Sequence, residues 1–91
     1  MIDLPALAHR NGLPCDEAGL AIPLGSGRIV AWGDAELAYT TADGDELAAK
    51  LILASIGPRI VCRGNSLTMT FTPDKLPAVA RMARDCGTLA I

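Results

Sequence analysis

The side chains in this sequence that could act as nucleophiles or metal ligands are three cysteines and one histidine. Cys15, Cys62 and Cys86 are widely spaced, form no CxxC pair, and are accompanied by a single histidine, His9. A zinc site needs paired ligands, and a disulfide framework needs an even number of cysteines. Cys62 or Cys86 could act as a nucleophile with His9, but nothing in the sequence places a thiol beside the imidazole. The pattern predicts three reduced cysteines, no metal site and no catalytic residue.

Two glycine-containing segments resemble fragments of ligand-binding loops. Gly25-Ser26-Gly27 could approach a phosphate, but the full dinucleotide fingerprint and a Walker lysine are missing, which favours an ordinary linker. Asp43 and Asp45 flank Gly44 as in part of a calcium loop, but the twelfth position holds Ala54 in place of glutamate. Helix capping explains these acids better. The sequence therefore predicts no cofactor.

Charge is distributed unevenly along the chain. Residues 1–49 carry eight acidic and two basic side chains, whereas residues 50–91 carry six basic and two acidic ones, for a net charge of −2. The basic half raises the alternative of a nucleic-acid-binding surface, for which the candidate residues are Arg59, Arg63, Arg81 and Arg84. The aromatic platform of sheet-based RNA binders is missing, and the pI of about 5.1 is acidic. A solvated charged face is the simpler interpretation.

Length and composition limit the fold. Ninety-one residues suffice for one domain, over residues 1–91. Apolar residues make up 51% and aromatic residues only 3%, so the core must be aliphatic. No apolar run approaches the ~20 residues of a membrane span, and the N-terminus lacks the features of a signal peptide. These features predict a cytoplasmic protein without membrane contact.

An internal similarity suggests the architecture. The segment 28–33 (RIVAWG) recurs as 59–64 (RIVCRG), and each copy fits a strand, a turn, a second strand and a helix. We therefore predict an α+β fold in which tandem ββα units at 28–57 and 58–87 follow an irregular N-terminal segment, 1–27. These units would form a mainly antiparallel four-stranded sheet with two helices on one face.

Turn residues set the expected strand register. Gly64-Asn65 suits a two-residue hairpin turn that places Arg63 opposite Ser66, and a longer turn would place Trp32 opposite Glu36. Directly opposed residues share a face of the sheet. The alternation then predicts a buried face that comprises Ile29, Ala31, Leu37, Tyr39, Ile60, Cys62, Leu67, Met69 and Phe71.

Capping residues and glycines set the expected helices. One helix is predicted over about 43–56, with acidic residues at its start, and another over about 74–86, with Asp74 or Thr72 as its cap. Pro77 is tolerated only in a first turn, which favours Asp74. Asp3 could cap a short helix over Leu4 to Arg10.

The only tryptophan falls on the predicted open face of the sheet. An exposed tryptophan rimmed by charge has the composition of a protein-binding hot spot. The candidate protein-binding residues are Trp32, Val30, Asp34, Glu36 and Val61. Alternatively, residues 1–27 could fold over this face and bury Trp32.

No motif identifies a family, so the functional prediction depends on surfaces. The sequence predicts a non-enzymatic protein-binding module that regulates or inhibits a larger protein complex, for example an anti-defence protein of a phage or mobile element, of the anti-CRISPR type. The partner would be a larger protein or a second copy of the chain. The alternative is a nucleic-acid-binding regulator that uses the basic C-terminal half.

Overall fold

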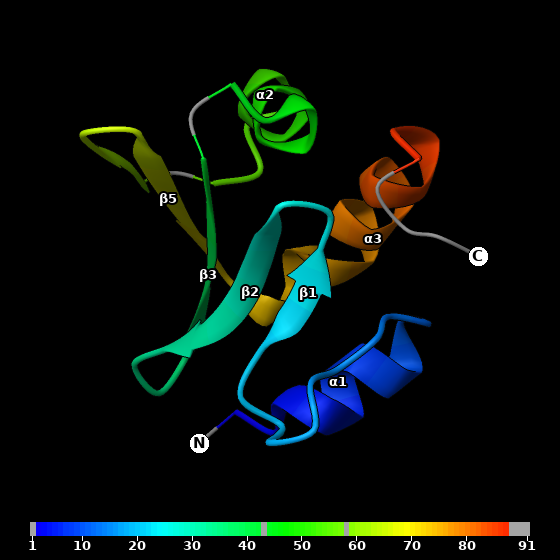
Figure 1. Cartoon of the computed structure of the whole chain (residues 1–91). Coiled ribbons are helices and arrows are strands. Elements are labelled where there is room, and N and C mark those ends of the chain that lie inside the picture. The colour runs from blue at the N-terminus through cyan, green and yellow to red at the C-terminus, as the bar shows by residue number, and fades with distance from the viewer. Residues whose placement is uncertain (1, 43, 58, 88–91) are drawn as a thin grey trace.

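The protein is a small α+β domain in which helices pack against one side of an antiparallel sheet (Figure 1). The computed structural model describes residues 2–42, 44–57 and 59–87. Within these residues the elements are, in chain order, α1 (Leu4–Arg10), β1 (Ile22–Leu24), β2 (Gly27–Trp32), β3 (Glu36–Ala42), α2 (Glu46–Leu53), β4 (Arg59–Arg63), β5 (Ser66–Phe71), the 3-10 turn η1 (Pro73–Lys75) and α3 (Leu76–Asp85).

The five strands lie in the order β1-β2-β3-β5-β4, and every neighbouring pair is antiparallel. Both predicted hairpin registers are confirmed, since Trp32 pairs with Glu36 and Arg63 pairs with Ser66. Because β3 and β5 pair in the centre, the two hairpins become one sheet with β1 and β4 at its edges.

The core fills the space between the sheet and the helices and is mostly aliphatic. Leu67, Met69 and Phe71 of β5 are buried as predicted, and so are Leu37 and Tyr39 of β3. Leu13, Ile22, Leu24 and Ile29 also belong to this cluster. The helices complete it with Leu4, Ala8, Leu47, Ala48, Leu51, Leu76, Val79, Ala80 and Ala83.

The predicted architecture is confirmed in outline and wrong in detail. The sheet has five strands instead of four because Ile22–Leu24 adds β1 beside β2, and three α-helices pack on it instead of two. The chain order β2-β3-α2 and β4-β5-α3 follows the ββα plan. The units are not exact copies, since η1 precedes the helix only in the second one.

Three residues predicted to be buried are exposed: Ile60, Cys62 and Ala31. Ile60 and Cys62 do lie on the helix side, opposite Met69 and Leu67, but no residue of edge strand β4 joins the core cluster. In β2, Ile29 is the last residue that pairs with β1. Ala31 lies beyond it, so no residue of β1 lies beside Ala31 to cover it. Alternation assigned the faces correctly, whereas burial also requires a covering element.

The helices also differ from their predicted limits. The α2 helix is shorter than predicted, and its cap is Asp45; the proposed contribution of Asp43 lies outside the described residues. Asp74 does not cap α3, because it lies inside η1, whose N-cap is Thr72. Pro77 occupies the first turn of α3, where the missing N–H does no harm.

Residues 2–27 join the core and leave the open face uncovered. Asp3 caps α1 as predicted, its carboxylate accepting the N–H of Ala6 at 3.2 Å. Leu4 and Ala8 of this helix pack into the core cluster. Trp32 remains 52% exposed, so the alternative that this segment buries it is wrong.

One carboxylate, that of Asp45, connects three parts of the fold. It accepts the N–H of Ala48 at 3.0 Å as the cap of α2, the hydroxyl of Tyr39 at 2.8 Å, and the hydroxyl of Ser26 at 3.0 Å. Burial, followed by this bond to Asp45, raises the pKa of Tyr39 well above its ordinary value, so the phenol stays a donor.

The segment predicted to be a linker is a tight turn that closes on this network. Leu24 pairs with Gly27, so Gly25-Ser26 turns the chain between β1 and β2. A Cβ on Gly27 would come within 2.8 Å of side-chain atoms of both Tyr39 and Thr41. The glycine is therefore required by packing rather than by a phosphate.

Replacement of Asp45 should destabilise the fold more than replacement of an ordinary cap. Asp45→Ala removes a helix cap, typically about 0.5–2 kcal/mol, and leaves the buried Tyr39 hydroxyl unpaired at roughly 1–3 kcal/mol more. In urea unfolding, the free energy of unfolding of Asp45→Ala should fall by the sum of these two contributions. Asp3→Ala, which removes only a cap, is the matched control, and equal losses for the two variants would contradict the role of Asp45.

Candidate functional site

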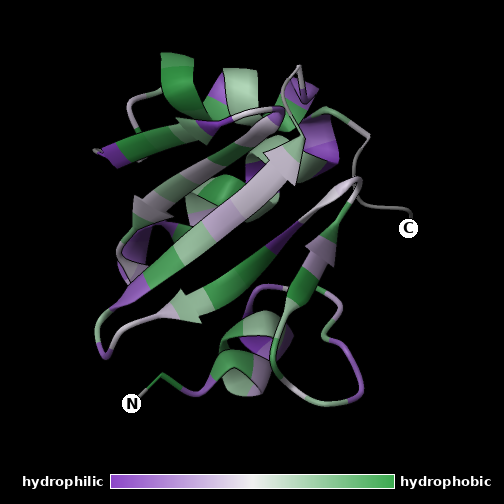
Figure 2. Cartoon of the chain, turned by 60° about the vertical axis from the view of Figure 1, so that its left-hand side comes forward, coloured by the Kyte–Doolittle hydropathy of each residue, from purple (hydrophilic) through white to green (hydrophobic). Residues whose placement is uncertain are grey.

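The side of the sheet that faces away from the helices is open (Figure 2). Antiparallel pairing arranges its side chains in rows that cross the strands. One row runs Val30, Ala38, Thr70 and Arg59, and the next runs Arg28, Thr40, Thr68 and Val61. The pairs Trp32–Glu36 and Ser66–Arg63 lie at opposite ends of the face.

The open face is locally basic although the chain is acidic. Arg28, Arg59 and Arg63 project from β2 and β4, and Glu36 is the only acidic residue in the strands on this side. Serine and threonine hydroxyls occupy the positions between the arginines. The face therefore offers hydrogen-bond donors and positive charge to an acidic ligand or partner.

The site that brings these groups together is a cavity of about 400 Å³, which we call the Trp32 hollow. Its volume falls in the range of roughly 300–1,000 Å³ typical of ligand sites. The indole of Trp32 and the side chain of Val61 provide apolar surface. The full lining is Trp32, Arg59, Val61, Arg63, Ser66, Thr68 and Thr70.

Thr70 gives this hollow an unusual polar group. The residue is only 7% exposed although it belongs to the open face, because Thr70 and Ala38 are small side chains between Val30 and Arg59 in one row. Among the described residues, its Oγ1 is the one buried side-chain polar atom without a hydrogen-bond partner. A buried hydroxyl in this state costs on the order of 1–3 kcal/mol.

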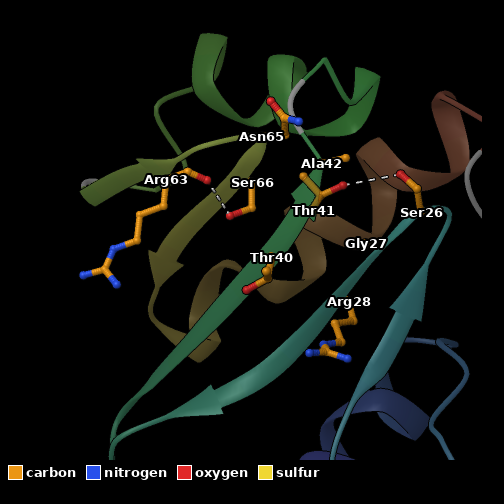
Figure 3. Close-up of a pocket in the computed structure, with 9 residues that line it drawn as sticks. All are labelled: Ser26, Gly27, Arg28, Thr40, Thr41, Ala42, Arg63, Asn65 and Ser66. Atoms are coloured by element: carbon orange, nitrogen blue, oxygen red, sulfur yellow. Dashed lines mark hydrogen bonds between the residues drawn. The ribbon is translucent and has the colours of Figure 1, made fainter.

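A second cavity, of about 480 Å³, continues the open face toward the turns and is drawn in Figure 3. Arg28 from β2 and Arg63 from β4 line it, with Thr40 of β3 between them in this view. It shares Arg63 and Ser66 with the Trp32 hollow, and the Ser66 hydroxyl donates to the carbonyl of Arg63 at 3.0 Å. The two cavities thus form one continuous surface.

The structure brings together only part of the predicted protein-binding set. Trp32 and Val61 line the same hollow, although they lie 29 positions apart in the sequence. Val30 is half-buried in the adjoining row. Asp34 lies in the β2–β3 turn and Glu36 pairs with Trp32, and neither residue lines the hollow.

The four arginines of the alternative nucleic-acid set lie in two places. Arg59 and Arg63 line the Trp32 hollow. Arg81 and Arg84 line a separate cavity of about 500 Å³ between α3 and the end of α1. There the Arg84 guanidinium donates to the backbone carbonyl of Asn11 at 2.7 Å, so Arg84 holds α1 to α3.

Arg28 and Thr70 belong to this surface but to neither candidate set. Strict alternation from Trp32 places Arg28 on the open face, so the sequence contained a signal for it. Nothing in the sequence signals the buried hydroxyl of Thr70, because its burial depends on neighbours from three other strands.

The residues considered for catalysis are dispersed. His9 is in α1, which lies below β1 in Figure 1, whereas Cys62 is in β4 at the opposite edge of the sheet. Cys15 and Cys86 are half-buried against the core, and all three cysteines are unpaired. Across 2–42, 44–57 and 59–87, no three His, Cys, Asp or Glu side chains cluster as metal ligands would.

Comparison with protein-family models, with curated proteins and with solved structures found no match to this chain. Within the part of the chain that the structure describes, no helix has the length and apolar character needed to cross a membrane.

Replacement of Thr70 by valine should not destabilise the protein. Valine keeps the shape of the side chain and removes the unpaired hydroxyl, so the free energy of unfolding should stay equal or rise by about 1–2 kcal/mol. Thr41→Val is the control, because the Thr41 hydroxyl lies 3.4 Å from that of Ser26 and its loss should destabilise the fold. A loss of stability in Thr70→Val as large as that in Thr41→Val would contradict this account.

Proposed function

We propose that this protein is a non-enzymatic binding module that engages a larger protein through the open face of its sheet. The observation that carries the proposal is the Trp32 hollow, where the only tryptophan lies with two arginines and a buried, unpaired hydroxyl. Tryptophan and arginine are the residue types most enriched at the energetic centres of protein interfaces.

The chemistry of the hollow supports an anchoring role for Trp32. Its side chain is half-exposed, so a partner that covers the indole gains apolar burial without unfolding the domain. Arg59 and Arg63 would pair with carboxylates of the partner, and guanidinium groups bind these with two parallel hydrogen bonds. The module would act as a regulator or inhibitor of its partner in the cytoplasm, where unpaired cysteines stay reduced.

Trp32→Ala should abolish partner binding and leave folding intact. Truncation of an interface hot spot costs about 2 kcal/mol or more, which is roughly a thirtyfold loss of affinity. Tagged wild-type and variant proteins would be compared by quantitative affinity capture from the native host and by thermal unfolding. The melting temperature should stay close to that of the wild type.

Leu20→Ala is the matched control, because Leu20 is a 70% exposed apolar side chain that lies outside both open-face cavities. This variant should retain both stability and partner capture. If Trp32→Ala were strongly destabilised while its folded fraction still captured the partner, Trp32 would be a core residue and the proposal would be wrong.

A second candidate function is the binding of single-stranded nucleic acid. Arg28, Arg59 and Arg63 share the open face with Trp32, and none of the described residues that line the two cavities there is acidic. Arginines that follow a backbone and an aromatic ring that stacks a base are the elements of single-strand recognition. One ring is fewer than the two or three used by most sheet platforms, so we rank this function second.

Fluorescence anisotropy with single-stranded RNA and DNA 20-mers would distinguish the two functions. We expect no appreciable binding near physiological salt. Binding that falls steeply with salt and is lost in Arg59→Ala/Arg63→Ala would instead establish the second function. Arg10→Ala/Arg81→Ala, which removes two arginines from the cavity beside α1, is the control for net charge.

A further inference from the structure

In the part of the chain that the structure describes, β4 forms one edge of the sheet and has no strand on its outer side. It is the last strand in the order β1-β2-β3-β5-β4, and all five of its residues are exposed. Ile60 on the helix side is 42% exposed and Val61 on the open side is 52% exposed, so the strand exposes a large apolar side chain on each face. In Figure 2 the outermost strand at the top of the sheet is green in its middle and purple at both ends.

The opposite edge of the sheet is protected in a way that β4 is not. Strand β1 has only three residues, and its central one is Pro23, which has no N–H to offer. Short strands and edge prolines are common devices against unwanted strand addition. Strand β4 contains no proline, and its row of outward N–H and C=O groups is a template for another strand.

The charges of β4 select what can pair with it. Arg59 and Arg63 lie on the same face, at the two ends of the strand. A second copy that paired all five residues in the antiparallel sense would place Arg59 opposite Arg63 twice, and in the parallel sense each arginine would meet its own copy. Like charges directly opposite one another destabilise a strand pair. A strand with acidic residues at these positions would be stabilised instead.

We propose that the β4 edge takes up an extended acidic segment of the partner protein as a sixth strand. The segment would have the pattern acidic–x–apolar–x–acidic, with its acidic residues opposite Arg59 and Arg63 and its apolar residue opposite Val61. This inference rests on the proposed protein-binding function and defines the chemistry of the partner.

The Trp32 hollow supports this geometry, because it adjoins the same strand. Arg59, Val61 and Arg63 line the hollow with Trp32, so alternate side chains of the added strand would project on its side of the sheet. The intervening side chains would cover Ile60 and Cys62 on the helix side. Main-chain hydrogen bonds would provide affinity, and the arginines would provide register and selectivity.

The test uses dye-labelled peptides and the full chain in fluorescence anisotropy. The probe is acetyl-Ser-Glu-Thr-Val-Thr-Glu-Ser-amide, and the control peptide has lysine in place of both glutamates. We expect the wild-type protein to bind the acidic peptide about tenfold more tightly than the lysine peptide. The variant Arg59→Glu/Arg63→Glu should reverse this preference and still fold, since both side chains are exposed and lie outside the core cluster.

Methylation of peptide nitrogens tests strand addition directly. Along an added strand alternate N–H groups point toward β4, so methylation of one alternate set should abolish binding and methylation of the other set should not. If methylation of either set weakened binding equally, the peptide would bind through ionic contacts alone, and the proposal would be wrong. Failure of the acidic peptide to bind would also overturn it. Wild-type dimers that the acidic peptide cannot dissociate would make a second copy the occupant and would also overturn it.

Peptide binding at the β4 edge and partner capture through Trp32 can fail independently of each other. If Trp32→Ala keeps both peptide binding and the alternating methylation pattern, the edge site stands, whatever role Trp32 has in the complete interface. If the peptide fails while Trp32→Ala still abolishes partner capture, the open-face function stands and the edge site is wrong.

Discussion

The carboxylate of Asp45 holds the parts of this small fold in register with one another. It accepts the N–H of Ala48 at the start of α2, the hydroxyl of Tyr39 from the centre of the sheet, and the hydroxyl of Ser26 from the β1–β2 turn. Tyr39 and Phe71 are the two aromatic residues of the core cluster, which otherwise offers only aliphatic and methionine side chains to fix the position of a helix. Directional bonds to a single charged group supply that precision, because charge-assisted hydrogen bonds are stronger than neutral ones.

The three helices cover only part of the sheet, and this incomplete cover creates the candidate site. They bury the helix-facing side chains of β1, β3 and β5 and Ile29 of β2, whereas β4 contributes nothing to the core cluster. The consequence is an edge strand with both faces exposed, beside an open face that is also uncovered. A domain of this size cannot cover all of its apolar surface, and what remains exposed is available to a partner.

In the folded chain, the positions of the charged side chains do not follow the division into an acidic first half and a basic second half. Acidic residues of the first half serve as helix caps, as Asp3 and Asp45 do, while arginines from both halves meet on the open face. Arg28 from β2 and Arg63 from β4 line one cavity, although they come from opposite sides of the charge asymmetry. A net charge of −2 therefore coexists with a locally basic surface, and the overall pI says little about the partner.

The sequence by itself determined the features that depend on neighbouring residues. Turn residues fixed both hairpin registers, alternation assigned Trp32 and Thr68 to the open face, and Asp3 marked the start of α1. Only the tertiary structure decided which of those faces is covered. Ile60 and Ala31 point to the helix side as alternation requires, yet both are exposed, because burial depends on helices and strands that are distant in the sequence. The pairing of β3 with β5 likewise brought Trp32 and Val61 to one hollow and buried the hydroxyl of Thr70, since contacts between separate hairpins leave no local pattern in the chain.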